Sequence, residues 1–292
     1  MNEGEESVWA EEFDSAWSLY ERFWLEKPPS LEGEEGKFSL SRERMELIQR
    51  ILKLNRLNLS KKLTAASEIL EEAAEALRSG GFSVFSVDGE LVWRGLPGSS
   101  SGLGSWVLEV GVSWDPILDL PVIPGSGIKG AARSFLEEYL KKRGGQLGKN
   151  VGERILKILF GEREGLGRAR FLDALPVSCD GKMLAEDVVN PHYNLQVRPI
   201  EREIDVRPNP VIHLALAPGL RFRFVVGVDE VEVEELGEAS GLFPEEVGEN
   251  LGSIAAFSLG GALRLGLGSR VLKGYGIFRI VDGDGNVKSE EG

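Results

Sequence analysis

The chain has 292 residues, of which 42% are hydrophobic and 28% are charged. This is the composition of an ordinary soluble globular protein with one large domain or two small ones. It contains no run of 18 apolar residues, so we expect no membrane-spanning helix. The single cysteine, Cys179, excludes an intrachain disulfide and a cysteine-rich zinc site, and we expect a reducing, cytoplasmic setting.

The net charge of −13 at first argues against a polyanionic partner, but the charge is unevenly distributed. Residues 1–40 carry eleven acids and three bases, a net of −8, whereas residues 262–280 contain four bases and no acid. The local field, rather than the global sum, decides whether a surface binds phosphate. An RNA-binding surface near the C-terminal end is therefore compatible with the composition.

Helical periodicity dominates the first 80 residues. Aromatic residues recur at spacings of three and four over residues 7–28, which predicts a helix with an aromatic stripe that packs in a core or interface. Two more helices are predicted over 41–55 and 60–79, the second closed by Gly80. We therefore expect residues 1–80 to form a helical N-terminal extension.

From residue 81 the pattern changes to that of a mixed domain, which we expect to end at residue 282 before a flexible tail over 283–292. Two hairpins are predicted, one of strands 82–87 and 91–94 around an Asp88–Gly89 turn and one of strands 211–217 and 221–228 across Pro218–Gly219. Single strands are predicted over 105–114, 171–175 and 275–281. Helices are predicted over 131–143 and 244–263, and an inserted loop over 177–209. The main order of strand, helix, strand, strand, helix, strand predicts an α+β, ferredoxin-like (RRM-like) core with inserted loops and hairpins.

The segment Pro124–Gly130 stands between a predicted strand and helix. A helix N-terminus favours an anion, Ser126 can cap the helix, and Lys129 and Arg133 lie one turn apart on one face. Lys129 is followed by glycine rather than by Ser or Thr, so the segment lacks the magnesium-binding hydroxyl of a Walker A loop. A nucleotide cofactor is not expected, and an ordinary turn with a helix cap is the alternative interpretation.

A glycine-rich loop, Gly266–Gly276, connects the last predicted helix to the last predicted strand. Its glycines allow close approach to a polyanion, and Tyr275 could stack on a base or ribose. Because the loop leaves a helix instead of opening one, it does not match a dinucleotide-binding fingerprint. The candidate RNA contacts here are Gly266, Gly268, Ser269, Arg270, Lys273 and Tyr275; the alternative is a flexible turn.

The polar segment Asp187–Tyr193 supplies a weaker third group of candidate RNA contacts: Asn190, His192 and Tyr193. His192 could also act as a general base. His213 lies in an alternating apolar strand and is expected to be a core or edge residue, and two histidines without a cluster of other ligands predict no metal site. Asp115 and Asp119 could be metal ligands or a general base, but they, like Asp173, are interpreted as structural carboxylates.

Together, LPVIPGSGIKGAAR, FLDALP and GLGSRVLKGYG resemble the RAMP superfamily of CRISPR-associated proteins, over roughly residues 105–280. The Asp187–Tyr193 segment is similar to the sixth subunits of type III-B, or Cmr, effector complexes. At Gly127 this chain departs from the pattern of the superfamily, which usually has a serine there.

The resemblance implies a subunit without an active site that binds the guide RNA toward its 3′ end and the target RNA paired with it. It implies neighbours among other RAMP subunits and the small helical subunit of the Cmr complex. Two alternatives remain open from the residues: a RAMP endoribonuclease that processes guide precursors with His192 as its base, and a structural cap that touches only protein.

Overall fold

The computed structural model describes residues 13–26, 41–98, 102–104, 108, 110–143, 145–162, 165–189, 211–232, 236–237, 241–244, 247 and 250–281. Within these ranges no helix is both long enough and apolar enough to cross a membrane. The helices are α2 (Ala16–Glu26), α3 (Ser41–Leu54), α4 (Leu59–Ser79), α5 (Gly125–Arg143), α6 (Gly145–Phe160), α8 (Leu251–Leu265) and the 3₁₀ turn η2 (Val271–Lys273). The short strand pairs are β2 (Trp114–Asp115) with β3 (Leu120–Pro121) and β4 (Gly161–Glu162) with β5 (Gly165–Leu166).

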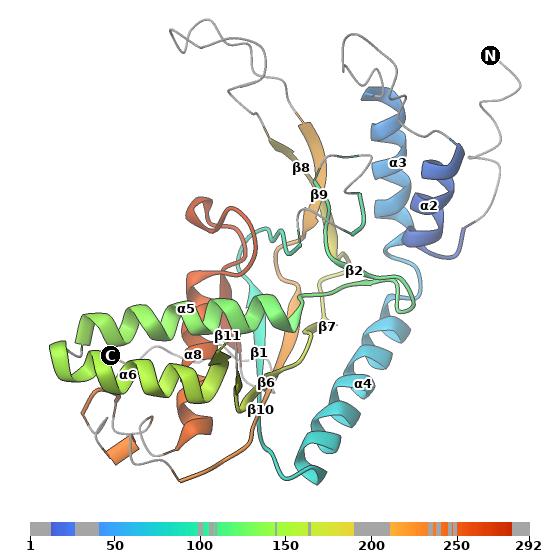
Figure 1. Ribbon diagram of the computed structural model, residues 1–292. Helices are drawn as coiled ribbons and strands as arrows, with labels where there is room; N and C mark the ends of the chain where they lie inside the picture. Colours follow the sequence, from blue (N-terminus) through green and yellow to red (C-terminus); the bar gives the residue numbers. More distant parts are fainter. Residues whose placement is uncertain are drawn as a thin grey trace, which may run out of the picture.

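A five-stranded antiparallel sheet forms the centre of the molecule (Figure 1). Its strands are β1 (Ser83–Leu91), β6 (Ala169–Phe171), β7 (Leu175–Ser178), β10 (Arg221–Val228) and β11 (Phe278–Val281). The spatial order is β11-β1-β10-β6, and β7 also pairs with β10, with an irregularity in register between Arg221 and Phe222. The protein is thus a mixed α+β structure with an antiparallel sheet and helices at its N-terminal end.

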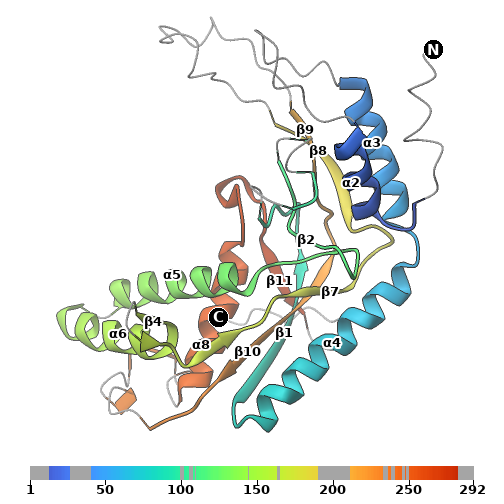
Figure 2. The ribbon, with the colours of Figure 1, turned by 45° about the vertical axis from the view of Figure 1, so that its right-hand side comes forward.

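Helices cover both faces of this sheet, and strand alternation shows which helix covers which face. Phe85 packs against Gly252 of α8, where an added Cβ would come within 2.4 Å of its ring. Val84 is paired in register with Gly227, which faces Leu77 of α4. Since neighbouring strand residues point to opposite faces, α8 and α4 lie on opposite sides of the sheet. Figure 2 shows this arrangement, with α5 beside α8.

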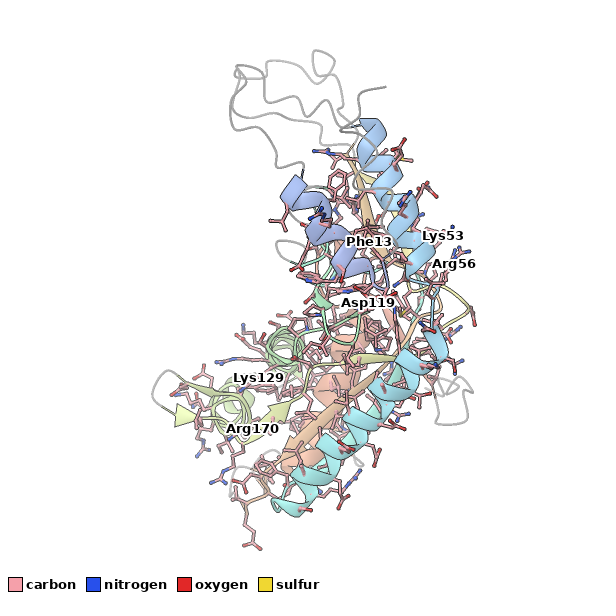
Figure 3. The ribbon with its side chains drawn as sticks, turned by 90° about the vertical axis from the view of Figure 1, so that its right-hand side faces the viewer. Phe13, Lys53, Arg56, Asp119, Lys129 and Arg170 are labelled. Carbon is pink, nitrogen blue, oxygen red and sulfur yellow. The ribbon has the colours of Figure 1, made fainter. Side chains whose placement is uncertain are left out.

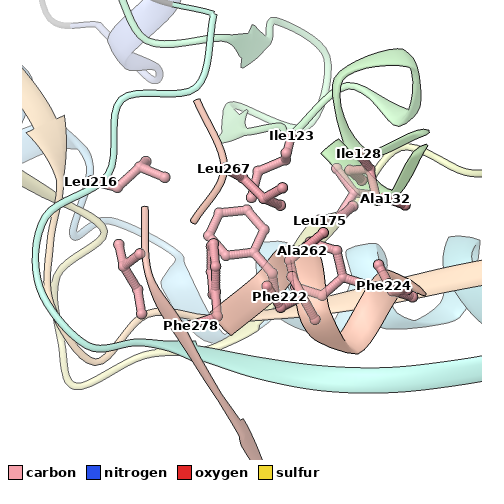
Figure 4. Close-up of a cluster of buried hydrophobic side chains, with 14 of the residues drawn as sticks. Ile123, Ile128, Ala132, Leu175, Leu216, Phe222, Phe224, Ala262, Leu267 and Phe278 are labelled. Atoms are coloured by element: carbon pink, nitrogen blue, oxygen red, sulfur yellow. The ribbon is translucent and has the colours of Figure 1, made fainter. Parts of the chain in front are cut away.

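Aromatic residues fill the core between the sheet and α8 (Figure 4). Phe278 of β11 meets Phe222 and Phe224 of β10 edge-on, with ring centroids 6.1 and 5.3 Å apart. All three rings are buried. Gly89 lies beneath them, because a Cβ there would be 3.0 Å from the Phe224 ring and 3.3 Å from Phe278.

The predicted hairpin turn at Asp88–Gly89 is wrong. Residues 83–91 form one continuous strand, and Asp88 and Gly89 pair with Arg223 and Phe222 of β10. The glycine is required for aromatic packing rather than for a turn, and Asp88 accepts hydrogen bonds from Arg223 at 2.8 and 3.0 Å.

The predicted hairpin of 211–217 with 221–228 is also wrong, although both strands exist. Strand β9 (Val211–Leu216) pairs with β8 (Leu184–Val189) in a separate two-stranded sheet, while β10 pairs with β1. Strand β8 lies in the segment predicted to be a loop, so that prediction is wrong for 184–189. The strand was not predicted because Asp187, although buried, is a charged residue that interrupts the alternation of apolar residues in the sequence.

Other elements differ in extent from their predictions. Helix α5 begins at Gly125, six residues before the predicted start, and α6 was not predicted. Of the strand predicted over 105–114, only Trp114 is regular strand among the described residues, and Val112 forms a single bridge to Leu103. The helix predicted from residue 244 begins at Leu251, after an Asn250 capping box.

Helix α2 is anchored by one buried carboxylate, Asp119, which is labelled in Figure 3. Asp119 accepts hydrogen bonds from the first two backbone N–H groups of α2, both at 3.2 Å, and from Trp114 Nε1 at 3.1 Å. Lys62 Nζ, from α4, forms an ion pair with Asp119 Oδ2 at 2.6 Å. The structural role predicted for Asp119 is confirmed: one side chain caps α2 and ties it to α4.

Candidate nucleic-acid interface

The glycine-rich loop is folded back on the segment that follows β1. Gly276 N donates to Arg94 O at 2.8 Å, and Ser269 N donates to Leu96 O at 3.0 Å. The loop closes on itself where Leu267 N donates to Gly276 O at 2.9 Å. An added Cβ on Gly276, whose φ is +69°, would lie 1.9 Å from Leu267 O. These hydrogen bonds give the loop a defined conformation against the segment that follows β1.

Two of the predicted cations stand at the tip of this loop. Arg270 has a φ of 61°, which turns the chain into η2. Lys273 and the neighbouring Leu272 are exposed, Leu272 completely at 103%. Among the described residues, neither Arg270 nor Lys273 forms an ion pair with a carboxylate. The tip thus offers positive charge that the described part of the protein does not neutralise.

Tyr275 has a different setting from the predicted stacking platform. Its hydroxyl donates a hydrogen bond to Asp187 Oδ2, and Arg94 Nη1 donates to Asp187 Oδ1. Asp187 is 7% exposed and lies opposite His213 in the β8–β9 ladder, with Oδ2 3.9 Å from Nε2. Asp187 thus joins three separate parts of the chain: the segment after β1, the β8–β9 sheet and the glycine-rich loop.

The protonation states in this network follow from burial and charge. Burial raises the pKa of Tyr275, and the hydrogen bond and charge of Asp187 raise it further, so the phenol keeps its proton. Burial lowers the pKa of the His213 side chain, and Arg270 and Arg94 oppose the contribution of Asp187. His213 is fully buried, which is one of the two settings, core or edge, that the sequence predicted for it.

The start of α5 is arranged around Asp173. Gly125 N donates to Asp173 Oδ1 at 2.7 Å, and Gly127 N and Ile128 N donate to Pro124 O at 2.9 and 3.1 Å. The structural role predicted for Asp173 is confirmed. The prediction that Ser126 caps the helix is wrong, because the helix already begins at Gly125 and the Asp173 carboxylate occupies its amide. Three N–H groups of this first turn have protein partners, which leaves the exposed Ser126 and the cationic side chains to meet an anion.

Lys129 and Arg133 belong to a second cationic cluster. Burial lowers the pKa of Lys129, and the charges of Arg170 and Arg133 lower it further. Both loops contribute to the same hydrophobic core, the first through Ile123 and the second through Leu267 (Figure 4). The cations of the two loops influence different groups. The charge of Arg270 lowers the pKa of His213 and Tyr275, whereas the charges of Arg133 and Arg170 lower the pKa of Lys129.

Arg94 and Arg170 were not recognisable as site residues from the sequence, and neither was the role of Asp187. Asp187 opens the polar segment that was singled out, but nothing in the sequence indicates that Arg94 and Tyr275 converge on it. Asn190, His192 and Tyr193 lie outside the described residues, beyond the end of β8 at Val189. Within the described ranges, no group of three or more metal-ligating side chains occurs.

Comparison with known proteins identifies the class of protein. The profile of the RAMP superfamily matches residues 98–279, more than half of the chain, so this is a RAMP superfamily protein. The match includes α5, the central strands β6, β7 and β10, and the glycine-rich loop.

A finer assignment comes from a characterised relative, the CRISPR system CMR subunit Cmr6 of Saccharolobus solfataricus. It is 31% identical over 249 residues, which cover 85% of this chain and 73% of that protein. The chain belongs to the Cmr6 family of RAMP proteins.

Two solved structures extend the comparison. A chain of the type III-B Cmr-β complex, determined by cryo-EM with cognate target RNA bound, is 29% identical, with a TM-score of 0.60. The match covers 86% of this chain and 77% of that chain. Cmr6 from Pyrococcus furiosus matches 68% of this chain and 97% of its own at 20% identity, with a TM-score of 0.39.

Proposed function

We propose that this protein is a non-catalytic, RNA-binding subunit of a type III-B CRISPR effector complex in antiviral defence. It contacts the guide RNA toward its 3′ end and the target RNA paired with it, beside other RAMP subunits and the small helical subunit. The similarity to a chain of the target-bound Cmr-β complex is the observation that carries this proposal. The unneutralised cations of the glycine-rich loop support it independently.

The core is proposed to be ferredoxin-like, with residues 81–282 as one RAMP domain, residues 1–80 as a helical extension and 283–292 as a tail. In chain order the central elements are β1, α5, β6, β10, α8 and β11. The antiparallel order β11-β1-β10-β6 places the fourth core strand beside the first and the third between the first and second. This is the order expected of two interleaved split βαβ units. Helix α6 and the β8–β9 sheet are insertions in this plan.

Binding is proposed to be largely independent of RNA sequence. Cationic side chains neutralise phosphates, which positions the RNA without reading its bases. The candidates are Ser126, Lys129 and Arg133 at α5, and Gly266, Gly268, Ser269, Arg270 and Lys273 in the loop, with Asn190, His192 and Tyr193 as a further group. Tyr275 holds the loop through Asp187 and contributes to binding by positioning.

The salt dependence of RNA binding tests this proposal. Arg270→Ala combined with Lys273→Ala removes up to two phosphate contacts. For single-stranded RNA the slope of log K against log salt should then become shallower by about 1.4. The control, Arg78→Ala with Lys142→Ala, removes the same charge from side chains that are paired with glutamates. An unchanged slope in the loop variant, or an equal change in the control, would remove the loop from the interface.

The enzymatic alternative has its own test. The purified protein is incubated with CRISPR repeat RNA, with and without His192→Ala. The proposed binding role predicts no cleavage by either form. Cleavage that His192→Ala abolishes would identify a processing endoribonuclease instead.

A further inference from the structure

Three basic side chains gather where α5, β6 and the α6–β6 connection meet. Lys129 is half-buried in the second turn of α5, and Arg133 follows one turn later on the same face. Arg170 comes from β6, the edge strand of the central sheet. Figure 3 shows Lys129 and Arg170 on the same side of the molecule. Within the described part of the chain, none of the three is paired with a carboxylate.

Glu137, an acid on the same helix as Lys129 and Arg133, is already engaged elsewhere. Glu137 lies one turn beyond Arg133, and Lys141 donates a hydrogen bond to it at 2.7 Å. Lys141 is also the principal cause that lowers the pKa of Glu137, whereas Arg133 acts on it only weakly through its charge. The positive charge of the cluster is therefore not neutralised by this neighbour.

Two glycines hold the arginines in place. Arg133 Nη1 donates to Gly161 O at 3.2 Å, and Arg170 Nη1 donates to Gly167 O. The backbones of Gly161 and Gly167 are in contact, since a Cβ on either would lie 2.5 Å from the backbone nitrogen of the other. The two guanidinium groups are thus fixed on neighbouring carbonyl groups. Each guanidinium has five N–H donors, so most of its donors remain available.

The electrostatics of the cluster favour an anion. The pKa of Lys129 is lowered by burial and then by the charges of Arg170 and Arg133, so the folded protein bears a cost for holding these charges together. A bound phosphate would lower that cost, and planar guanidinium groups match phosphate oxygens better than an ammonium group does. Arg170 also lies over the Phe82 ring, with its Cζ 5.9 Å from the ring centroid. This contact limits the orientations that the Arg170 guanidinium group can adopt.

We propose that Arg170, together with Lys129 and Arg133, forms a phosphate-binding site for the RNA backbone that is separate from the glycine-rich loop. This inference rests on the proposed RNA-binding function and adds a contact on β6 to it. The ligand is a phosphodiester, recognised by charge and hydrogen bonds without base readout. The site lies at the sheet edge, so an RNA strand that occupies it runs along β6 and the start of α5.

The test measures RNA affinity against salt for the assembled complex with Arg170→Gln in this subunit. Glutamine keeps an N–H donor for Gly167 O and removes the charge, so the fold is preserved. The slope should become shallower by about 0.7 for single-stranded RNA or about 0.9 for a duplex. The matched control is Arg168→Gln, since Arg168 is paired with Asp229 at 2.5 Å. It should leave the slope unchanged.

Two arms separate the possible strands and the possible failures. Complexes are titrated once with guide RNA alone and once, guide-loaded, with target RNA; a change in either arm supports the site and identifies the strand. If Arg170→Gln behaves as the control in both arms while Arg270→Ala with Lys273→Ala still reduces the slope, the β6 site is refuted and the proposed function stands. If wild-type complex shows no binding that depends on this subunit, the proposed function itself fails.

Discussion

Replacement of Asp187 by alanine should destabilise the protein strongly. The carboxylate is 7% exposed and accepts from both Arg94 and Tyr275. Loss of one partner of a buried charge pair costs about 3–5 kcal/mol, and each hydrogen bond to a charged group contributes about 1.5–3 kcal/mol. Because Arg94 is 28% exposed, water can solvate it in the variant, which places the expected loss of unfolding free energy near the lower limit, about 3 kcal/mol.

Urea denaturation followed by circular dichroism measures this loss. The adjacent Glu186→Ala is the matched control, since Glu186 is exposed and, within the described ranges, its carboxylate accepts a hydrogen bond only from Gln49. That control should change stability by no more than about 0.5 kcal/mol. Tyr275→Phe removes one of the two hydrogen bonds, and its effect should not add to that of Asp187→Ala. Equal effects of Asp187→Ala and Glu186→Ala, or full additivity with Tyr275→Phe, would refute the reasoning that Asp187 joins the three segments.

Three further substitutions test other parts of the structure. Gly276→Ala should distort the glycine-rich loop, because its Cβ would lie 1.9 Å from Leu267 O; loss of RNA affinity with a lowered melting temperature is expected, and wild-type values would contradict this geometry. Asp119→Ala removes the cap of α2 and the partner of Lys62, which should cost about 3 kcal/mol in denaturation, whereas a loss below 1 kcal/mol would show that α2 is held by other contacts. Burial raises the pKa of Glu90, but hydrogen bonds from two cross-strand arginines hold it below its usual value overall. Its stabilisation is therefore present above the unfolded pKa of about 4.3 and is lost as the pH falls, so Glu90→Gln should flatten the acid side of the stability curve; an unchanged curve would exclude this linkage.

The sequence predicted the order of the main elements but not how the strands pair. Pro218–Gly219 is a turn between two real strands, yet those strands belong to different sheets, because β9 has a closer partner in β8. The residues of a turn do not indicate which strands pair when a strand has another partner elsewhere in the chain. Likewise, Gly89 was interpreted as a turn residue although tertiary packing of Phe224 and Phe278 is what requires it.

The candidate site, like the fold, was predicted from the sequence only in part. The cations of the glycine-rich loop were recognisable from composition alone, since no acid lies near them in sequence. The partners Arg94 and Arg170 were not, because they come from segments 93 residues away from Asp187 and 41 residues away from Lys129, respectively. Tyr275 was predicted to stack on RNA, and only the fold shows that its hydroxyl is engaged by a buried carboxylate.

The central claim is that this chain touches RNA through its two cationic clusters, and crosslinking in the assembled complex tests it most directly. The complex, loaded with photoreactive guide RNA and target RNA, is irradiated and the adducts on this subunit are mapped to peptides by mass spectrometry. Adducts are expected in the loop between Gly266 and Gly276 and around Lys129 to Arg133. Adducts on the neighbouring subunits with none on this chain would contradict it and would identify the protein as a structural cap.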